Sequence, residues 1–165
     1  MPQLYLIRHG IAADREHFEH DFDRPLTDRG IEKTSQIAQR LAALGLCFDR
    51  ILTSPLVRAQ QTAELLRVAG LCGVIEEFGA LAPGGDVEAL VAWWSGSHPV
   101  QAREAIAIVG HQPDLGQWAE WLLWGQLMEK LIVKKAGVIG LDVPVEGLAC
   151  GACELFWLTP PRLLL

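Results

Sequence analysis

Short apolar runs alternate with longer amphipathic segments along this 165-residue chain. The short runs have the length of buried strands, whereas the longer segments repeat their apolar residues at helical spacing. The pattern predicts strands at residues 4–7, 50–53, 74–75, 105–109, 136–143 and 152–158. It predicts helices at residues 27–44, 55–68, 86–94 and 113–124, and a polar loop at residues 14–24.

Glycine, proline and aspartate mark the ends of several predicted helices. Gly45 follows the first helix and Gly70 follows the second, where a left-handed residue commonly ends a helix. Asp86 is placed to cap the third helix. In the first helix the apolar residues expected near one face are Ile31, Ile37, Leu41 and Leu44.

Strands that alternate with helices are typical of an α/β fold with a mostly parallel sheet. We expect an open sheet with helices on both faces. The last two strands are joined without a helix, so they are expected to form an antiparallel hairpin at or near one edge. The length suits one domain over residues 1–165, and no repeat or linker interrupts it.

Composition and charge narrow the classes of function. Hydrophobic residues make up 50% of the chain and the formal net charge is −6, which argues against disorder and against nucleic acid as a partner. The apolar run at residues 4–7 is too short for a signal peptide, and no run is long enough to span a bilayer. We therefore expect a cytoplasmic protein without a membrane partner.

Four cysteines leave a metal or redox role to consider. Cys150 and Cys153 have the C-x-x-C spacing of metal ligands, but Cys47 and Cys72 are isolated and supply no second pair. In a reducing cytoplasm such cysteines are usually small buried apolar residues. The sequence thus predicts no metal site, with a C-x-x-C metal or redox protein as a minor alternative.

Candidate chemistry falls at the ends of three predicted strands. Parallel strands bring their carboxyl ends to one edge of a sheet, where α/β proteins bind ligands. The first strand ends in Arg-His-Gly, the second leads through Ser54 into a helix, and the fourth ends in Gly-His-Gln. The residues expected to converge at this edge are Arg8, His9, Arg58 and His111.

Two arginines and two histidines suit a dianion such as a phosphoryl group. Arginine matches phosphate oxygens with a planar fork, and the helix N-termini after Ser54 and Gln112 would add backbone donors. A sulfate site could look the same, but the second histidine indicates chemistry. One neutral imidazole can attack phosphorus while the other, protonated, neutralises developing charge. Each residue alone would be read as structural; the four together favour function.

At these positions the sequence resembles the histidine phosphatase superfamily, which has the phosphoglycerate mutase-like fold. The resemblance rests on Arg8-His9-Gly10, on Ser54 to Thr62 and on Val109-Gly110-His111. It implies that His9 is the nucleophile, that the phosphoryl oxygens are held by Arg8, Arg58 and His111, and that no cofactor is needed. The segments at residues 24–30 and 82–86 look specifically like SixA-type phosphohistidine phosphatases.

One departure from the family concerns the general acid. Many phosphomonoesterases and mutases of the superfamily carry a glutamate at the position that corresponds to Ala80, and Glu76 and Glu77 lie out of register with it. Asp14 or Asp21 in the loop after His9 could supply a carboxylate instead. An alkoxide leaving group needs such an acid, whereas a phosphoramidate releases an imidazole that can be protonated beforehand.

The sequence therefore predicts a phosphohistidine phosphatase that passes the phosphoryl group through phospho-His9 and releases inorganic phosphate. Its expected partner is a phosphohistidine-bearing protein, such as a histidine phosphotransfer domain in signal transduction. One alternative is a phosphomonoesterase or mutase acting on a small metabolite, and another is a module that binds phosphoproteins without turnover. The tryptophans Trp118, Trp121 and Trp124 lie along one stripe, which is expected to be core or else a partner surface.

Overall fold

A computed structural model describes residues 1–96 and 103–165 of the chain. Six strands form one sheet in the order β3-β2-β4-β1-β5-β6. The strands are β1 (Gln3–Arg8), β2 (Arg50–Thr53), β3 (Ile75–Glu77), β4 (Ala105–Gly110), β5 (Val138–Asp142) and β6 (Glu154–Thr159). The helices are α1 (Asp28–Ala43), α2 (Val57–Val68), α3 (Val87–Ser95) and α4 (Asp114–Trp124).

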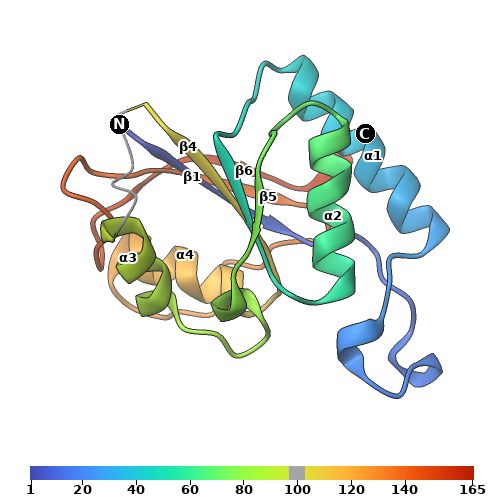
Figure 1. The fold of residues 1–165 in the computed structure, drawn as a ribbon. Helices are drawn as coiled ribbons and strands as arrows, with labels where there is room; N and C mark the ends of the chain where they lie inside the picture. Colours follow the sequence, from blue (N-terminus) through green and yellow to red (C-terminus); the bar gives the residue numbers. More distant parts are fainter. Residues whose placement is uncertain (97–102) are drawn as a thin grey trace.

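The four strands β1 to β4 run parallel, and β5 and β6 complete the sheet as an antiparallel pair beside β1. Helices α1 and α2 cover one face of the sheet, and α3 and α4 cover the other (Figure 1). This arrangement confirms the predicted α/β fold with a mostly parallel sheet and a C-terminal hairpin. β6 lies at the sheet edge, as expected.

Strand β1 shows why the sheet is covered on both faces. Successive side chains of a strand point to opposite faces, and every central residue of β1 is apolar and buried. Leu4 and Leu6 pack in the core beneath α3 and α4, while Tyr5 and Ile7 pack in the core beneath α1 and α2. A continuous apolar run is the pattern of a strand with no solvent-facing side.

The first helix corrects one prediction. Thr27 caps α1 by accepting a hydrogen bond from the Gly30 amide, but Ile31 is 38% exposed and Leu44 is 49% exposed. The buried stripe instead runs through Gly30, Thr34, Ile37, Ala38 and Leu41. Gly30 belongs to it because a Cβ there would lie 2.0 Å from the Ile11 carbonyl oxygen. A glycine and a threonine occupy buried positions that apolar periodicity cannot reveal.

Smaller differences concern loops and helix ends. The polar segment after His9 contains two short 3-10 turns, Arg15–His17 and Asp21–Asp23. Helix α2 begins at Val57 rather than at Pro55. Trp118 is buried in the core and Trp121 packs against it, which favours the core interpretation of the stripe, whereas Trp124 remains 44% exposed.

Two further features concern the predictions made from the cysteines and from the length of the apolar runs. All four cysteines are free; Cys72 and Cys153 are buried, and Cys47 and Cys150 are exposed. Over residues 1–96 and 103–165 there is no helix whose length and hydropathy would let it cross a membrane.

Candidate active site

The carboxyl ends of β1 and β4 bring two histidines side by side. Arg8 at the end of β1 pairs in register with Gly110 at the end of β4, so the next residues, His9 and His111, are neighbours. Their ring centroids lie 5.1 Å apart. Arg58, near the start of α2, reaches the same place, and all four residues line one cleft of about 540 Å³.

His9 presents a neutral nitrogen to this cleft. Its Nδ1 lies 2.7 Å from the Gly10 carbonyl oxygen, which can only accept, so Nδ1 carries the proton. Nε2 then holds a lone pair, which accepts a hydrogen bond from Arg58 Nε at 3.3 Å. Burial is the main factor that lowers the pKa of His9 to about 3, and the charges of His111 and both arginines add to it. At neutral pH, His9 Nε2 is therefore available as a nucleophile.

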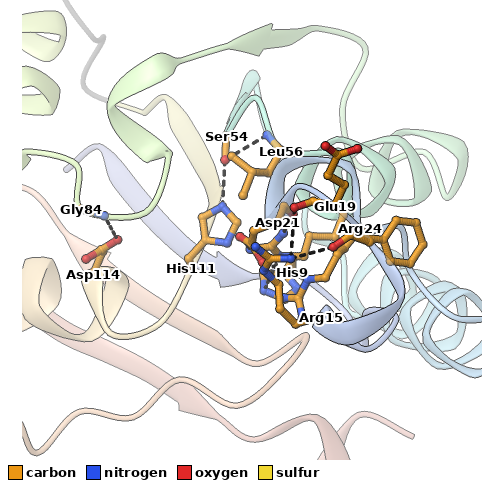
Figure 2. A network of polar contacts seen from close by, with 12 residues as sticks. His9, Arg15, Glu19, Asp21, Arg24, Ser54, Leu56, Gly84, His111 and Asp114 are labelled. Atoms are coloured by element: carbon orange, nitrogen blue, oxygen red, sulfur yellow. Dashed lines mark hydrogen bonds and ion pairs between the residues drawn. The ribbon is translucent and has the colours of Figure 1, made fainter.

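His111 is held by Ser54 on the neighbouring strand end. Its Nε2 forms a hydrogen bond of 2.8 Å with Ser54 Oγ, and the same oxygen accepts a hydrogen bond from the Leu56 amide at 3.3 Å (Figure 2). Burial, followed by the charge of Arg58, lowers the pKa of His111 to about 4. A bound phosphoryl dianion would act in the opposite direction and favour the protonated ring.

Two buried nitrogens in the cleft are suited to an oxyanion: Arg8 Nε, which always donates, and His111 Nδ1, which donates when it carries a proton. Within the described residues, neither Arg8 Nε nor His111 Nδ1 has a hydrogen-bond partner. Arg8 is fixed from behind, because its guanidinium donates to the Val133 carbonyl oxygen at 3.0 Å. Burial and the nearby Arg58 lower the pKa of Arg8, so an anion that relieves this repulsion is stabilised.

Arg58 is held by a carboxylate rather than by a carbonyl alone. It donates to the Asp21 carbonyl oxygen at 2.8 Å and to Asp21 Oδ2 at 2.9 Å. Arg24 Nε lies 3.0 Å from the other carboxylate oxygen, Asp21 Oδ1. Desolvation raises the pKa of Asp21, but the hydrogen bond and charge of Arg58 outweigh it and leave that pKa below its usual value. Asp21 is thus ionised at neutral pH.

Comparisons with known proteins place this site in a family. The model of the histidine phosphatase superfamily (branch 1) matches residues 4–77, which include Arg8, His9 and Arg58. An uncharacterized protein of Picosynechococcus sp. is 47% identical over 167 residues, covering 99% of each chain. The chain belongs to the histidine phosphatase superfamily.

Solved structures of the superfamily share the complete fold. The structure of the protein histidine phosphatase SixA complexed with tungstate has a TM-score of 0.84 and 24% identity, and covers 98% of this chain and 99% of that one. A phosphoserine phosphatase from Entamoeba histolytica has a TM-score of 0.71 and 18% identity, with 100% of both chains covered. Membership of the superfamily supports phosphatase activity, but the shared fold does not select the substrate.

A partial match illustrates the same limit. A protein of Cronobacter sakazakii named "Probable phosphoglycerate mutase GpmB" is 42% identical over 78 residues, which cover 46% of this chain but only 35% of that protein. The match covers less than half of the chain, so the site must be read from the structure.

The other predicted site residues have different positions. Ser54 lies in the site as the hydrogen-bond partner of His111. Gln112 lines the cleft, but its side-chain amide is engaged with backbone: Oε1 accepts from the Val133 amide at 3.1 Å and Nε2 donates to the Leu131 carbonyl at 3.2 Å. Asp21 lines the cleft, whereas Asp14 is exposed and lies outside its lining.

The candidate acids upstream of Pro83 are engaged elsewhere. Glu76 pairs with Arg50 on β2 at 2.6 Å, and Glu77 accepts from the Gln60 side chain at 3.0 Å. Neither lines the cleft, and neither does Ala80.

Three charged residues of the cleft were missed from sequence: Arg24, Asp114 and Lys135. Arg24 stands at the head of the SixA-like segment 24–30, and Asp114 opens the helix three residues after His111, so position could have indicated both. Asp114 Oδ2 accepts from the Gly84 amide at 2.9 Å, which ties the segment 83–84 to the cleft (Figure 2). Lys135 had no distinguishing signal.

A buried glutamate supports the Arg8 side of this phosphatase site. Glu120 on α4 has no exposed surface, and its carboxylate accepts from four consecutive backbone amides, those of Met128 to Leu131. Burial opposes its ionisation, but these four donors outweigh it and lower the pKa of Glu120 below its ordinary value. We call residues 128–136 the strap, since this segment also carries the Val133 carbonyl that holds Arg8.

Proposed function

We propose that this chain is a phosphohistidine phosphatase that dephosphorylates a phosphohistidine-bearing protein, such as a histidine phosphotransfer domain in a signalling pathway. His9 Nε2 attacks phosphorus, the bond from phosphorus to the substrate imidazole breaks, and that imidazole leaves as a neutral ring. Water then attacks the phosphorus of phospho-His9, which releases inorganic phosphate and restores neutral His9. Arg8, Arg58 and His111 hold the non-bridging oxygens.

One observation carries the choice of substrate: the predicted carboxylate that does line the cleft, Asp21, is ionised and paired with Arg58. A carboxylate held in that state cannot donate a proton to a leaving alkoxide. General acid catalysis is commonly worth about a hundred- to ten-thousand-fold, so ester hydrolysis would lose most from this arrangement.

A phosphohistidine avoids that requirement. Its imidazole can take up a proton from solvent before the bond breaks, and free imidazole has a conjugate acid with a pKa of about 6.5. The substrate thus supplies a good leaving group without help from an enzyme acid. The structural likeness to the protein histidine phosphatase SixA is in keeping with this proposal.

Asp114 favours a second candidate, a phosphomonoesterase or mutase acting on a small metabolite. Its carboxylate lines the same cleft and bonds only the Gly84 amide among the described contacts, so it is less constrained than Asp21. An acid at this position would lie on the α4 side of the phosphoryl group. Asp114→Asn is therefore the variant that separates the two candidates.

The test is a side-by-side turnover assay with a phosphorylated histidine phosphotransfer domain and a panel of phosphomonoesters. We expect strong preference for the phosphohistidine, complete loss of turnover in His9→Ala, and little change in Asp114→Asn. Broad ester hydrolysis that Asp114→Asn abolishes would establish the second candidate. If the protein binds phosphate but turns over neither substrate, both enzymatic candidates are rejected and the chain is a phosphate-binding module.

The proposal also places the enzyme in the cytoplasm, where phosphotransfer signalling acts and where its four free cysteines would stay reduced. No cofactor enters the steps above, because the positive charge comes from the two arginines and from His111 once the bound dianion favours its protonated form. Activity that survives exhaustive treatment with a chelator would agree with this.

A further inference from the structure

A second cleft, distinct from the phosphoryl site, lies where α1 meets the chain's last residues. It has a volume of about 500 Å³ and is walled mainly by apolar side chains. Ile37 and Ala136 form its buried floor, and Pro160 and Pro161 form one side. The volume is that of a pocket able to take a bulky apolar group.

All the charged side chains that line this cleft are cationic. The chain has four lysines, and three of them, Lys33, Lys134 and Lys135, line the cleft together with Arg162. The lining contains no aspartate or glutamate. Within residues 1–96 and 103–165, none of these four cations forms an ion pair. In a protein of net charge −6, this local concentration of unpaired positive charge is complementary to an acidic partner.

The cleft adjoins the phosphoryl site. Lys135 lines both, and Ile11, two residues beyond His9, lines the apolar wall. A chain segment with its phosphohistidine on His9 could therefore place a nearby side chain in this cleft. An isolated phosphoryl group would need only the first cleft.

We propose that the lysine-rimmed cleft binds an acidic segment of the phosphorylated partner protein, with one of that segment's large apolar side chains in the cleft. This inference rests on the proposed function, since the segment is taken to flank the phosphohistidine. The apolar side chain contributes burial, and the surrounding acids meet the cations of the rim. The cleft thus selects among phosphohistidine proteins, while the phosphoryl site performs the reaction.

The experiment uses three substrates: a phosphohistidine peptide with leucine and glutamates around the modified residue, its counterpart with lysines for glutamates, and the phosphoramidate ion. The test variant is Lys33→Glu combined with Arg162→Glu, at two cations that line the cleft outside the strap. Arg40→Glu, at an exposed arginine of α1 off the cleft, is the control. Lys134 and Lys135 are left intact, because Lys134 belongs to the strap and Lys135 also lines the phosphoryl site.

We expect kcat/KM for the acidic peptide to be at least about tenfold lower in the double variant than in the wild type, chiefly through KM. The ratio of kcat/KM for the acidic peptide to that for the lysine peptide should also be smaller in the double variant. Phosphoramidate turnover should stay unchanged in all variants, which also reports that each is folded. Replacing the leucine of the acidic peptide with asparagine should lower kcat/KM of the wild-type enzyme for that peptide, again chiefly through KM.

Equal turnover of acidic and lysine peptides by the wild-type enzyme would overturn the docking proposal and leave the phosphatase proposal intact. Failure to hydrolyse any of the three substrates would instead reject the phosphatase proposal. Binding of decanoate that the double variant loses, without discrimination between peptides, would make the cleft a site for a small amphiphilic anion and would likewise overturn docking.

Discussion

The two arginines of the phosphoryl site are held in opposite ways. Arg8 donates to a backbone carbonyl of the strap, and the strap is fixed by a glutamate with no exposed surface. Arg58 is held by Asp21, whose side chain is 40% exposed and lies on a 3-10 turn of the loop after His9. The position of Arg8 therefore depends on the buried core, whereas that of Arg58 depends on a loop at the surface.

This difference indicates which part of the site is rigid and which part can adjust when an anion binds. A carbonyl keeps Arg8 in place without neutralising its charge, so the guanidinium is preorganised for the phosphoryl oxygens. A carboxylate on Arg58 competes with those oxygens for the same cation. We therefore expect the Arg8 side to determine stability and geometry, and the Arg58 side to determine affinity for anions.

The largest effect is expected from Glu120→Gln. The amide keeps one acceptor oxygen but turns a donor toward backbone amides, so about two of the four N–H groups lose their partner. Hydrogen bonds to charged groups contribute about 1.5–3 kcal/mol each, so we expect the loss of two to lower the free energy of unfolding by ~3–6 kcal/mol. Displacement of Val133 should also weaken orthophosphate binding through Arg8. Urea unfolding and calorimetry measure the two effects.

The pH dependence of this loss sharpens the test. The folded pKa of Glu120 lies below its unfolded value, so its contribution is present above about pH 4.3 and is lost as the pH falls through the folded value. The gap in stability between wild type and Glu120→Gln should shrink accordingly in acid. Glu146→Gln, at an exposed glutamate, is the control. A Glu120→Gln variant as stable as wild type at pH 7 would contradict the role assigned to the strap.

A smaller effect on the same side is expected from Gly116→Ala. A Cβ at Gly116 would lie 1.9 Å from the Leu131 carbonyl oxygen and 2.8 Å from Gln112 Nε2, so the strap must move. Overpacking of this kind costs about 1–3 kcal/mol. We expect that loss in urea unfolding, with phosphate binding weakened as well. Gly73→Ala, whose Cβ would meet nothing within 4 Å, is the matched control; equal behaviour of the two variants would show that the strap does not position Arg8.

The same contrast explains how much of the site the sequence could predict. His9, His111 and both arginines were predictable because they stand at fixed distances from strand ends, and a parallel sheet brings strand ends together. The fold was predictable as well, because the spacing of apolar residues distinguishes short buried strands from amphipathic helices. In α1, however, Gly30 and Thr34 occupy the buried stripe, so the pattern assigned Ile31 and Leu44 to the wrong face.

The supports of the site were harder to predict because they depend on contacts between distant segments. Glu120 lies in an ordinary amphipathic helix, and only the strap, whose path no periodicity predicts, shows that its charge is buried. Gln112 was expected beside the phosphoryl group and does line the cleft, but only the structure shows that its side-chain amide is bound to the same strap. Any residue type can supply a backbone amide or carbonyl, so the sequence of the strap gives no sign that it binds these side chains.

Asp21→Asn is the substitution with the smallest expected effect on stability, and it tests the other half of the comparison. The pair with Arg58 has one exposed partner, and such pairs contribute about 0–1 kcal/mol, so unfolding in urea should barely change. Affinity for orthophosphate should instead rise, by roughly three- to tenfold, because one negative charge leaves the cleft and a neutral amide oxygen competes less strongly for Arg58 Nη2 than a carboxylate does.

Glu19→Gln, at an exposed position in the same loop, controls for a general change in charge. If Asp21→Asn binds phosphate more weakly than wild type, Asp21 orients Arg58 rather than competing for it, and the two arginines would be preorganised alike. If binding tightens while turnover of a phosphohistidine peptide slows, the carboxylate limits product inhibition. In that case the loop holds Arg58 strongly enough to position it but weakly enough to release phosphate.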